Sequence, residues 1–87
     1  MEIISTAKIA IRARYDICDR ITYGKVYSKE DNQHVANVKE VGYGTIELEM
    51  LPGFEERKDY VEADFEKLRT ELVDYANFWH AREDRPH

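Results

Sequence analysis

The stretch Gly44-Thr45-Ile46-Glu47-Leu48-Glu49-Met50-Leu51 carries the clearest structural pattern in this chain of 87 residues. From Ile46 to Met50 every second residue is apolar, and the residues between them are charged. This period of two is typical of a β-strand with one buried and one solvated face. Gly42 precedes the stretch and Pro52-Gly53 follows it, so turns are expected on both sides. We interpret the stretch as the central strand of a small sheet.

Three segments before this stretch are also predicted to be strands. Residues 8–15 alternate between apolar and polar side chains, as a half-buried strand does. Residues 21–27 predict a turn that enters a second strand, with Gly24 as the flexible corner. Residues 35–41 have two mixed faces, so we expect an edge strand or a β-bulge there.

A helix over residues 7–21 is an alternative to the first strand. Ser5-Thr6 would cap this helix, and one of its faces would carry Ala7, Ile11, Tyr15 and Cys18. The strand is favoured because the alternation along residues 8–15 is regular. Cys18 is the only cysteine, so we expect no internal disulfide and interpret this residue as a small buried apolar side chain.

A long amphipathic helix is predicted over about residues 63–81. Its apolar residues recur at spacings of three or four, at Phe65, Leu68, Leu72, Tyr75, Ala76 and Trp79. Asp64 is expected to cap the helix or to complement its dipole. Residues 58–62 predict a short last strand, and the charged tail 82–87 is expected to fray. Strands over about residues 7–62 and this helix predict a single α+β domain, residues 1–87, in which four to five antiparallel strands pack against one C-terminal helix.

Two motifs and the order of these segments resemble a known family. The motifs are Thr22-Tyr23-Gly24-Lys25-Val26-Tyr27 and Tyr60-Val61-Glu62-Ala63-Asp64-Phe65-Glu66-Lys67-Leu68. Over roughly residues 7–68 the chain resembles small SH3-like β-barrel proteins of bacteriophages and prophages, from which its longer helix departs. The resemblance implies an SH3-like sheet or barrel and a phage origin. A fold by itself implies no activity.

The charge of the chain is unevenly distributed, with a net value of −5. Residues 1–43 have a net charge of +1 and residues 44–87 a net charge of −6. Because phosphate binding requires clustered cations, nucleic acid is a poor partner for the surface as a whole. We find no apolar run of ~18 residues and no signal-peptide pattern, so we expect a soluble protein in the cytoplasm of a bacterial host, without membrane contact.

The sequence favours a protein that is not an enzyme and that needs no cofactor or metal. Its three histidines are far apart, and it has neither a phosphate-binding loop nor a nucleophile motif. Glu47 and Glu49 lie about 7 Å apart by strand rise, a spacing that suits a two-carboxylate hydrolase. We interpret them instead as surface residues that pair with Arg12 and Arg14, provided that the first and fourth strands are neighbours.

The acidic half of the chain favours an interaction protein that binds and inhibits a bacterial host protein or defence factor. The residues expected to contact this partner are Phe54, Glu55, Glu56, Glu62, Glu66, Glu71 and Asp74. Phe54 has two interpretations, because an aromatic residue in a loop either packs on the core or contacts a partner.

Two other functions stay open. A binding module would hold a nucleotide or a single-stranded nucleic acid through Arg12, Arg14, Tyr23, Lys25 and Tyr27. This function requires the cations of the first half to lie on one face. Alternatively, a self-associating structural protein would form a homodimer through Val73, Phe78 and Trp79.

Overall fold

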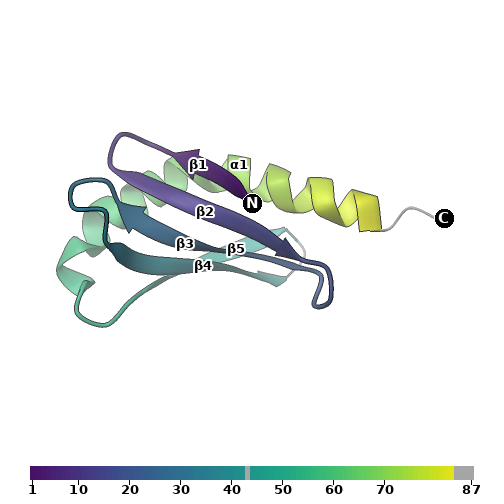
Figure 1. Ribbon diagram of the computed structural model, residues 1–87, viewed down its shortest axis with the longest axis horizontal. Coiled ribbons are helices and arrows are strands. Elements are labelled where there is room, and N and C mark those ends of the chain that lie inside the picture. Colours follow the sequence, from purple (N-terminus) through teal and green to yellow (C-terminus); the bar gives the residue numbers. More distant parts are fainter. Residues whose placement is uncertain (43, 84–87) are drawn as a thin grey trace.

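The fold is an open antiparallel sheet with one long helix behind it, as the computed structural model of the chain shows for residues 1–42 and 44–83 (Figure 1). Within these residues the elements are β1 (Glu2–Ser5), β2 (Ile9–Asp16), β3 (Ile21–Ser28), β4 (His34–Gly42), β5 (Thr45–Met50), the 3-10 helix η1 (Glu55–Arg57) and α1 (Lys58–Glu83). Each strand is antiparallel to the next, and their order in the sheet is β1-β2-β3-β4-β5. Helix α1 packs on one face, and no described element covers the other. The predicted α+β class is confirmed, and the sheet is not closed into a barrel.

The hydrophobic core lies between the sheet and α1. Alternate residues of the strands and every third or fourth residue of the helix point into it, because side chains at these periods share a face. The buried apolar residues are Ile4, Ile9, Ile11, Ala13, Val26, Val35, Ala36, Val38, Ile46, Val61, Phe65, Leu68, Leu72 and Ala76. Each fully buried Ile or Leu contributes about 1.5–3 kcal/mol relative to an exposed one. Phe54 packs against this core, which confirms the first of its two interpretations.

The strands occupy different places in the sheet from those predicted. The predicted central strand forms β5, which lies at one edge, whereas the predicted edge strand at residues 35–41 forms part of β4 and lies inside the sheet. The period of a strand reports which side chains share a face and not which strands are neighbours, so the sequence pattern does not fix this order. The predicted irregularity is present in β4, as a register shift between Glu40 and Gly42.

Gly24 lies in the middle of the sheet and not at a corner. It belongs to β3, and a Cβ at this position would lie 2.7 Å from the carbonyl oxygen of Arg12. Strands β2 and β3 therefore approach one another closely here because residue 24 has no side chain. The turn that joins these strands lies instead at residues 17–20, where Arg20 has a positive φ of 56°.

The structure decides between the two interpretations of residues 7–21, and it adds a strand at the N-terminus. Strand β2 and a turn occupy residues 7–21, so the strand interpretation is confirmed and the helix alternative was wrong. Cys18 lies in this turn and is exposed, so its prediction as a buried residue was wrong. Strand β1 was not predicted, because only Ile4 of its four residues is buried and a single buried residue shows no alternation.

The helix begins earlier than predicted. Residues 58–62 form its first turns and not a strand, because Val61 lies four residues before Phe65 and continues the buried helical stripe. Asp64 is not a cap, since it lies within α1, where its carboxylate accepts a hydrogen bond from the Thr6 hydroxyl. This hydrogen bond lowers the pKa of Asp64. Residues 82–83 belong to α1, and the rest of the predicted frayed tail lies outside the described residues, as does Tyr43.

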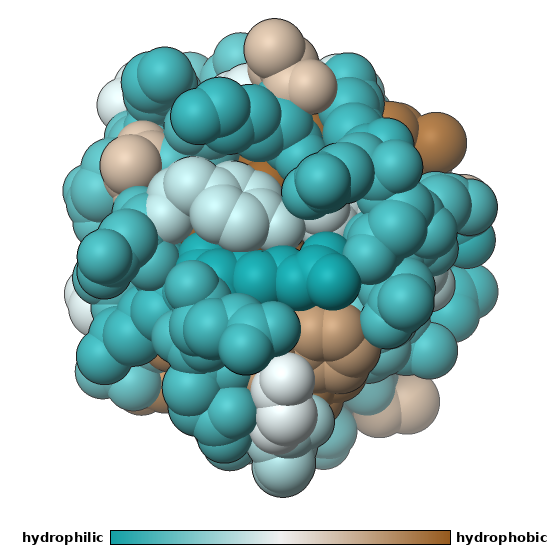
Figure 2. All heavy atoms as spheres, turned by 90° about the vertical axis from the view of Figure 1, so that its left-hand side faces the viewer, coloured by the Kyte–Doolittle hydropathy of each residue, from teal (hydrophilic) through white to brown (hydrophobic). Residues whose placement is uncertain are grey.

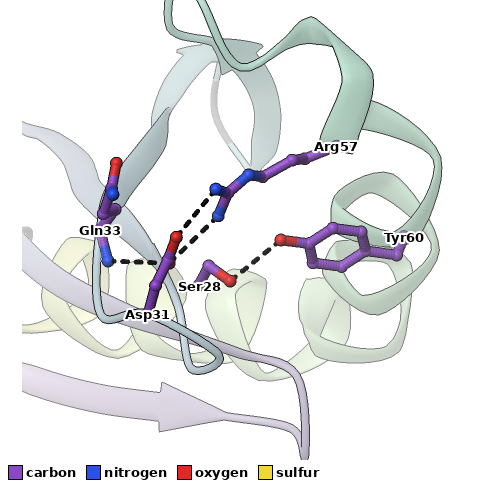
Figure 3. A network of polar contacts seen from close by, with 5 residues as sticks. All are labelled: Ser28, Asp31, Gln33, Arg57 and Tyr60. Carbon is purple, nitrogen blue, oxygen red and sulfur yellow. Dashed lines mark hydrogen bonds and ion pairs between the residues drawn. The ribbon is translucent and has the colours of Figure 1, made fainter.

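The N-terminal end of α1 is held to the β3–β4 turn by polar side chains (Figure 3). Arg57 donates two hydrogen bonds to the Asp31 carboxylate, of 3.1 and 2.8 Å, and these lower the pKa of Asp31. The hydroxyls of Ser28 and Tyr60 share a hydrogen bond of 2.9 Å. Figure 2 shows this end of the molecule, where hydrophilic residues cover most of the surface. This end of the helix is therefore held largely by groups near water.

The C-terminal end of α1 is held by a buried cluster. One oxygen of the Glu40 carboxylate accepts a hydrogen bond of 2.9 Å from the Thr22 backbone N–H. The other accepts one of 2.8 Å from the Gly44 backbone N–H and one of 2.8 Å from His80 Nε2. Burial opposes ionisation of Glu40, but these donors outweigh it and lower the pKa of Glu40 below its usual value. Beside His80, the ring of Tyr15 stacks on Trp79.

Candidate functional site

The uncovered face of the sheet is the candidate site, because it gathers charged and aromatic side chains from neighbouring strands. Two cross-strand rows define it. From β2 to β5, the first row is Arg12, Lys25, Asn37 and Glu49, and the second is Arg14, Tyr23, Lys39 and Glu47. All eight residues are exposed, because they alternate along each strand with residues that face the core.

Four cations lie on this face without a carboxylate partner. Among the described residues, no ion pair involves Arg12, Arg14, Lys25 or Lys39. Arg12 lies directly opposite Lys25 in the β2–β3 register, and its guanidinium lies 4.7 Å from the ring centroid of Tyr27. Like charges directly opposite one another destabilise a sheet, so this arrangement leaves positive charge that an anion can neutralise.

A shallow hollow of about 530 Å³ lies over β3, β4 and β5 on the same face. Gly24 lines it, and the surrounding side chains include Tyr23, Lys25, Lys39 and Glu47. The cations lie on β2, β3 and β4, and the carboxylates of Glu47 and Glu49 lie on β5. Asp16 and Asp19, at the β2–β3 turn, also line the hollow, so the cations and tyrosines of this face are bordered by carboxylates at that turn and on β5.

The residues predicted for a nucleotide or single-strand site lie together here. Arg12, Arg14, Tyr23 and Lys25 are exposed on the uncovered face, and Tyr27 is half-buried beneath Arg12. Lys39 belongs to the same cluster but was not predicted. The register of β3 and β4 places it opposite Tyr23, and this register follows from the turn between the strands and not from the local sequence.

The expected pairing of Arg12 and Arg14 with Glu47 and Glu49 was wrong. It required β2 and β5 to be neighbours, but β3 and β4 lie between them. Each row crosses the sheet from an arginine to a glutamate, with two residues in between. Because adjacent strands lie about 4.8 Å apart, these side chains lie on opposite sides of the face.

The residues predicted to contact a protein partner lie in three separate places. Glu55 and Glu56 are in η1, beside Phe54. Glu62 and Glu66 line a hollow between α1 and β5. Glu71 and Asp74 line a groove between α1 and β1, at the opposite edge of the sheet. Glu66 also forms an ion pair of 2.7 Å with Arg69, and Glu62 one of 3.5 Å with Lys58.

Of the residues predicted for self-association, Phe78 and Trp79 contact one another and line one groove, which Val73 does not line. Val73 is half-buried and packs against the core, and Trp79 is half-buried and stacks on Tyr15. Phe78 alone of the three is exposed.

Two other kinds of feature are absent from the described residues. Within the described residues, no three His, Cys, Asp or Glu side chains are grouped as metal ligands. The helices of the described part of the chain are too short or too polar to cross a membrane.

The uncovered face can bind an anionic chain or ligand through its cations and stack planar groups on its tyrosines. Comparisons of this chain with protein-family models, with curated proteins and with solved structures gave no match.

Proposed function

We propose that the protein is a non-catalytic binding module that holds a single-stranded nucleic acid on the uncovered face of its sheet. The observation that carries this proposal is the group of four cations beside Tyr23 and Tyr27, none of which forms an ion pair with a residue that the structure describes. Proteins that bind single strands combine cations that contact the phosphates with aromatic rings on which bases stack.

Tyr23 and Tyr27 differ in how accessible their rings are to a base. Tyr23 has 38% of its surface exposed, so a face of its ring is accessible. Tyr27 is half-buried and already lies beneath the guanidinium of Arg12, which fixes the direction of that cation. We expect Tyr23 to stack on a base and Arg12 to contact phosphate or the edge of a base.

The net charge of −5 limits binding to this one face. Glu47 and Glu49 repel phosphates, so the strand should run along β2 and β3 and away from β5. Eight residues of β2 span about 26 Å, which is enough for about four nucleotides, the lower end of the usual site size. Weak binding with a strong dependence on salt is expected.

The test is a titration of a fluorescein-labelled oligothymidylate of about ten nucleotides, followed by anisotropy at about 50 and about 200 mM salt. With four phosphate contacts, the logarithm of the affinity should fall with the logarithm of the salt concentration with a slope of about −3. The double variant Arg12→Ala/Lys25→Ala should reduce this slope by about 1.4. Tyr23→Ala should weaken binding about fivefold or more through the loss of stacking.

The matched control is Lys58→Ala, which removes an exposed cation from α1, behind the sheet. It should leave both the affinity and the slope unchanged. Absence of binding at low salt, or an equal effect of Lys58→Ala, would exclude the proposal. Equal displacement of the oligonucleotide by polyglutamate would also exclude it, because a face without base stacking would bind any anionic chain.

The role as an inhibitor of a bacterial host protein stays a prediction, as do the phage origin and the bacterial cytoplasm. The acidic residues named for that role lie in three places, so one partner would need to contact several sides of the molecule.

A further inference from the structure

A groove of about 570 Å³ lies between β1 and the C-terminal half of α1. Met1, Ile4, Phe78 and Trp79 provide its apolar lining, and Tyr75 adds a third aromatic ring. Met1 and Phe78 are 75% and 54% exposed, although both are large apolar side chains. An apolar patch of this kind on a small protein commonly marks a contact with another chain.

The groove is acidic at its rim. Glu2 from β1 and Glu71 and Asp74 from α1 line it, and none of the described lysines or arginines does. The two helical acids lie one turn before the aromatic residues, since Asp74 precedes Phe78 by four positions and Glu71 precedes Tyr75 by four. A partner that fills this groove must therefore bring apolar side chains together with positive charge.

The chain itself supplies an example of this chemistry. The guanidinium of Arg82 lies 5.3 Å from the ring centroid of Phe78 and 5.8 Å from that of Trp79. These rings thus accept a cation over their faces in the folded protein.

One edge of the sheet borders the groove. Strand β1 pairs only with β2 among the described strands, so the backbone groups on its other side are open to a further strand. At the opposite edge, Arg69 donates a hydrogen bond of 2.7 Å to the carbonyl oxygen of Ile46 in β5. One acceptor of that edge is thus already used, which makes β1 the more open edge.

From this arrangement we infer that the groove binds an extended segment of a partner protein, which adds to β1 as a further strand. Every second side chain of the segment points into the groove, and these side chains include apolar residues that contact the rings and Lys or Arg residues that contact Glu2, Glu71 and Asp74. Strand addition of this kind takes affinity from backbone hydrogen bonds and specificity from the pockets for alternate side chains.

A second copy of the chain is a poorer occupant. A symmetric contact through β1 brings the same surface of both copies together. Glu2, Glu71 and Asp74 of one copy would then lie near the same three carboxylates of the other, and like charges at an interface oppose association.

The test uses a labelled peptide of about eight residues, titrated against the whole chain, in which every second position is Leu or Lys in turn and the positions between are Thr, so that Leu and Lys share one face of the strand. Glu71→Lys/Asp74→Lys should weaken binding about tenfold or more. Phe78→Glu should weaken it to a similar degree although it adds a negative charge, which separates apolar contact from general attraction. The matched control is Glu55→Lys/Glu56→Lys, which reverses the same number of charges in η1 and should leave the affinity unchanged.

The same peptide with N-methyl groups on alternate residues tests strand addition. Methylation along the edge that faces β1 should abolish binding, whereas methylation of the other edge should not. Equal weakening by the Glu55→Lys/Glu56→Lys control would overturn the proposal, and so would equal binding of all the peptides. A dimer of the free chain in sedimentation velocity that Phe78→Glu splits would instead assign the groove to a second copy.

Discussion

The two ends of α1 are held to the sheet by contacts that differ in their exposure to water. At the N-terminal end, the side chains of the Arg57–Asp31 ion pair are 22% and 31% exposed. At the C-terminal end, those of the His80–Glu40 pair are 8% and 2% exposed. The first pair joins η1, directly before α1, to the β3–β4 turn, the second joins α1 to β4, and both have short distances of 2.8 Å.

This difference shows that the distance between two groups does not by itself determine how much their contact stabilises the fold. Water solvates both members of an exposed pair when the pair breaks, so little stability is lost. Loss of one member of a buried pair leaves the other desolvated and without a partner. The contacts that hold the C-terminal half of α1, which carries the proposed peptide groove, therefore include the buried carboxylate of Glu40 beside the core packing of Leu72 and Ala76.

Removal of that carboxylate should have the largest effect. Glu40→Ala leaves His80 and the backbone N–H groups of Thr22 and Gly44 without their acceptor. We expect the free energy of unfolding, measured in urea, to fall by about 3 kcal/mol. Glu49→Ala is the matched control in the adjacent strand, and as an exposed change it should cost less than about 0.5 kcal/mol. Equal losses in the two variants would mean that burial is not the deciding factor.

The stability of the protein should depend on pH through the carboxylate of Glu40. Because the folded state lowers the pKa of Glu40, its contribution is complete above the unfolded-state pKa of about 4.3 and is lost as the pH falls through the lower folded value. Urea midpoints measured from neutral to acid pH should therefore fall less steeply in Glu40→Gln than in the unaltered chain. Asp31, Asp64 and Glu66 titrate in both proteins, so the difference between the two curves reports the Glu40–His80 pair. Parallel curves would contradict the expectation.

At the N-terminal end, the hydroxyl pair should matter more than the ion pair. Tyr60→Phe removes one hydrogen bond and leaves the buried Ser28 hydroxyl without this partner, so we expect a loss of about 1 kcal/mol in the urea series. Tyr23→Phe removes a hydroxyl from the uncovered face and serves as the control, with no measurable loss expected. If Tyr60→Phe lowered the free energy of unfolding as much as Glu40→Ala, the two ends of α1 would not differ as expected.

The exposed ion pair should give the smallest effect. Asp31→Asn removes the charge that Arg57 contacts but keeps the size of the side chain. The melting temperature should fall slightly at low salt, and the difference should disappear at about 1 M salt, where the Debye length is about 3 Å. A difference that persists at high salt would mean that this pair is shielded from solvent in solution.

Patterns within single segments predicted most of the fold. Alternation predicted the strands that became β2 and β5, turn and β-branched residues predicted β3, a less regular pattern predicted β4, and the stripe from Phe65 to Trp79 predicted α1. The order of strands in the sheet depends on which segments meet in space, so neither the edge position of β5 nor the inner position of β4 was evident. Glu40 made one face of residues 35–41 look mixed, but that face is the buried one, and its partner His80 lies 40 residues away.

The sequence predicted only the part of the candidate site that lies on the β2–β3 hairpin. The β2–β3 register places Arg12 opposite Lys25 and Arg14 opposite Tyr23, and these residues were already named as one possible binding set. Lys39 joins them through the next hairpin. The acidic groove was not predictable, because it combines β1, which the sequence did not reveal, with residues of α1 more than 60 positions later.

The hydrogen bond from Arg69 to the Ile46 carbonyl oxygen bears on the solubility of the chain at high concentration. Filaments grow when every added molecule presents a fresh unpaired edge to the next one. If two chains join through β1, both outer edges of the pair are β5 strands, each with an acceptor already occupied and with Glu47 and Glu49 projecting beside it. In such a pair, these features of β5 would disfavour the addition of a third chain at either outer edge.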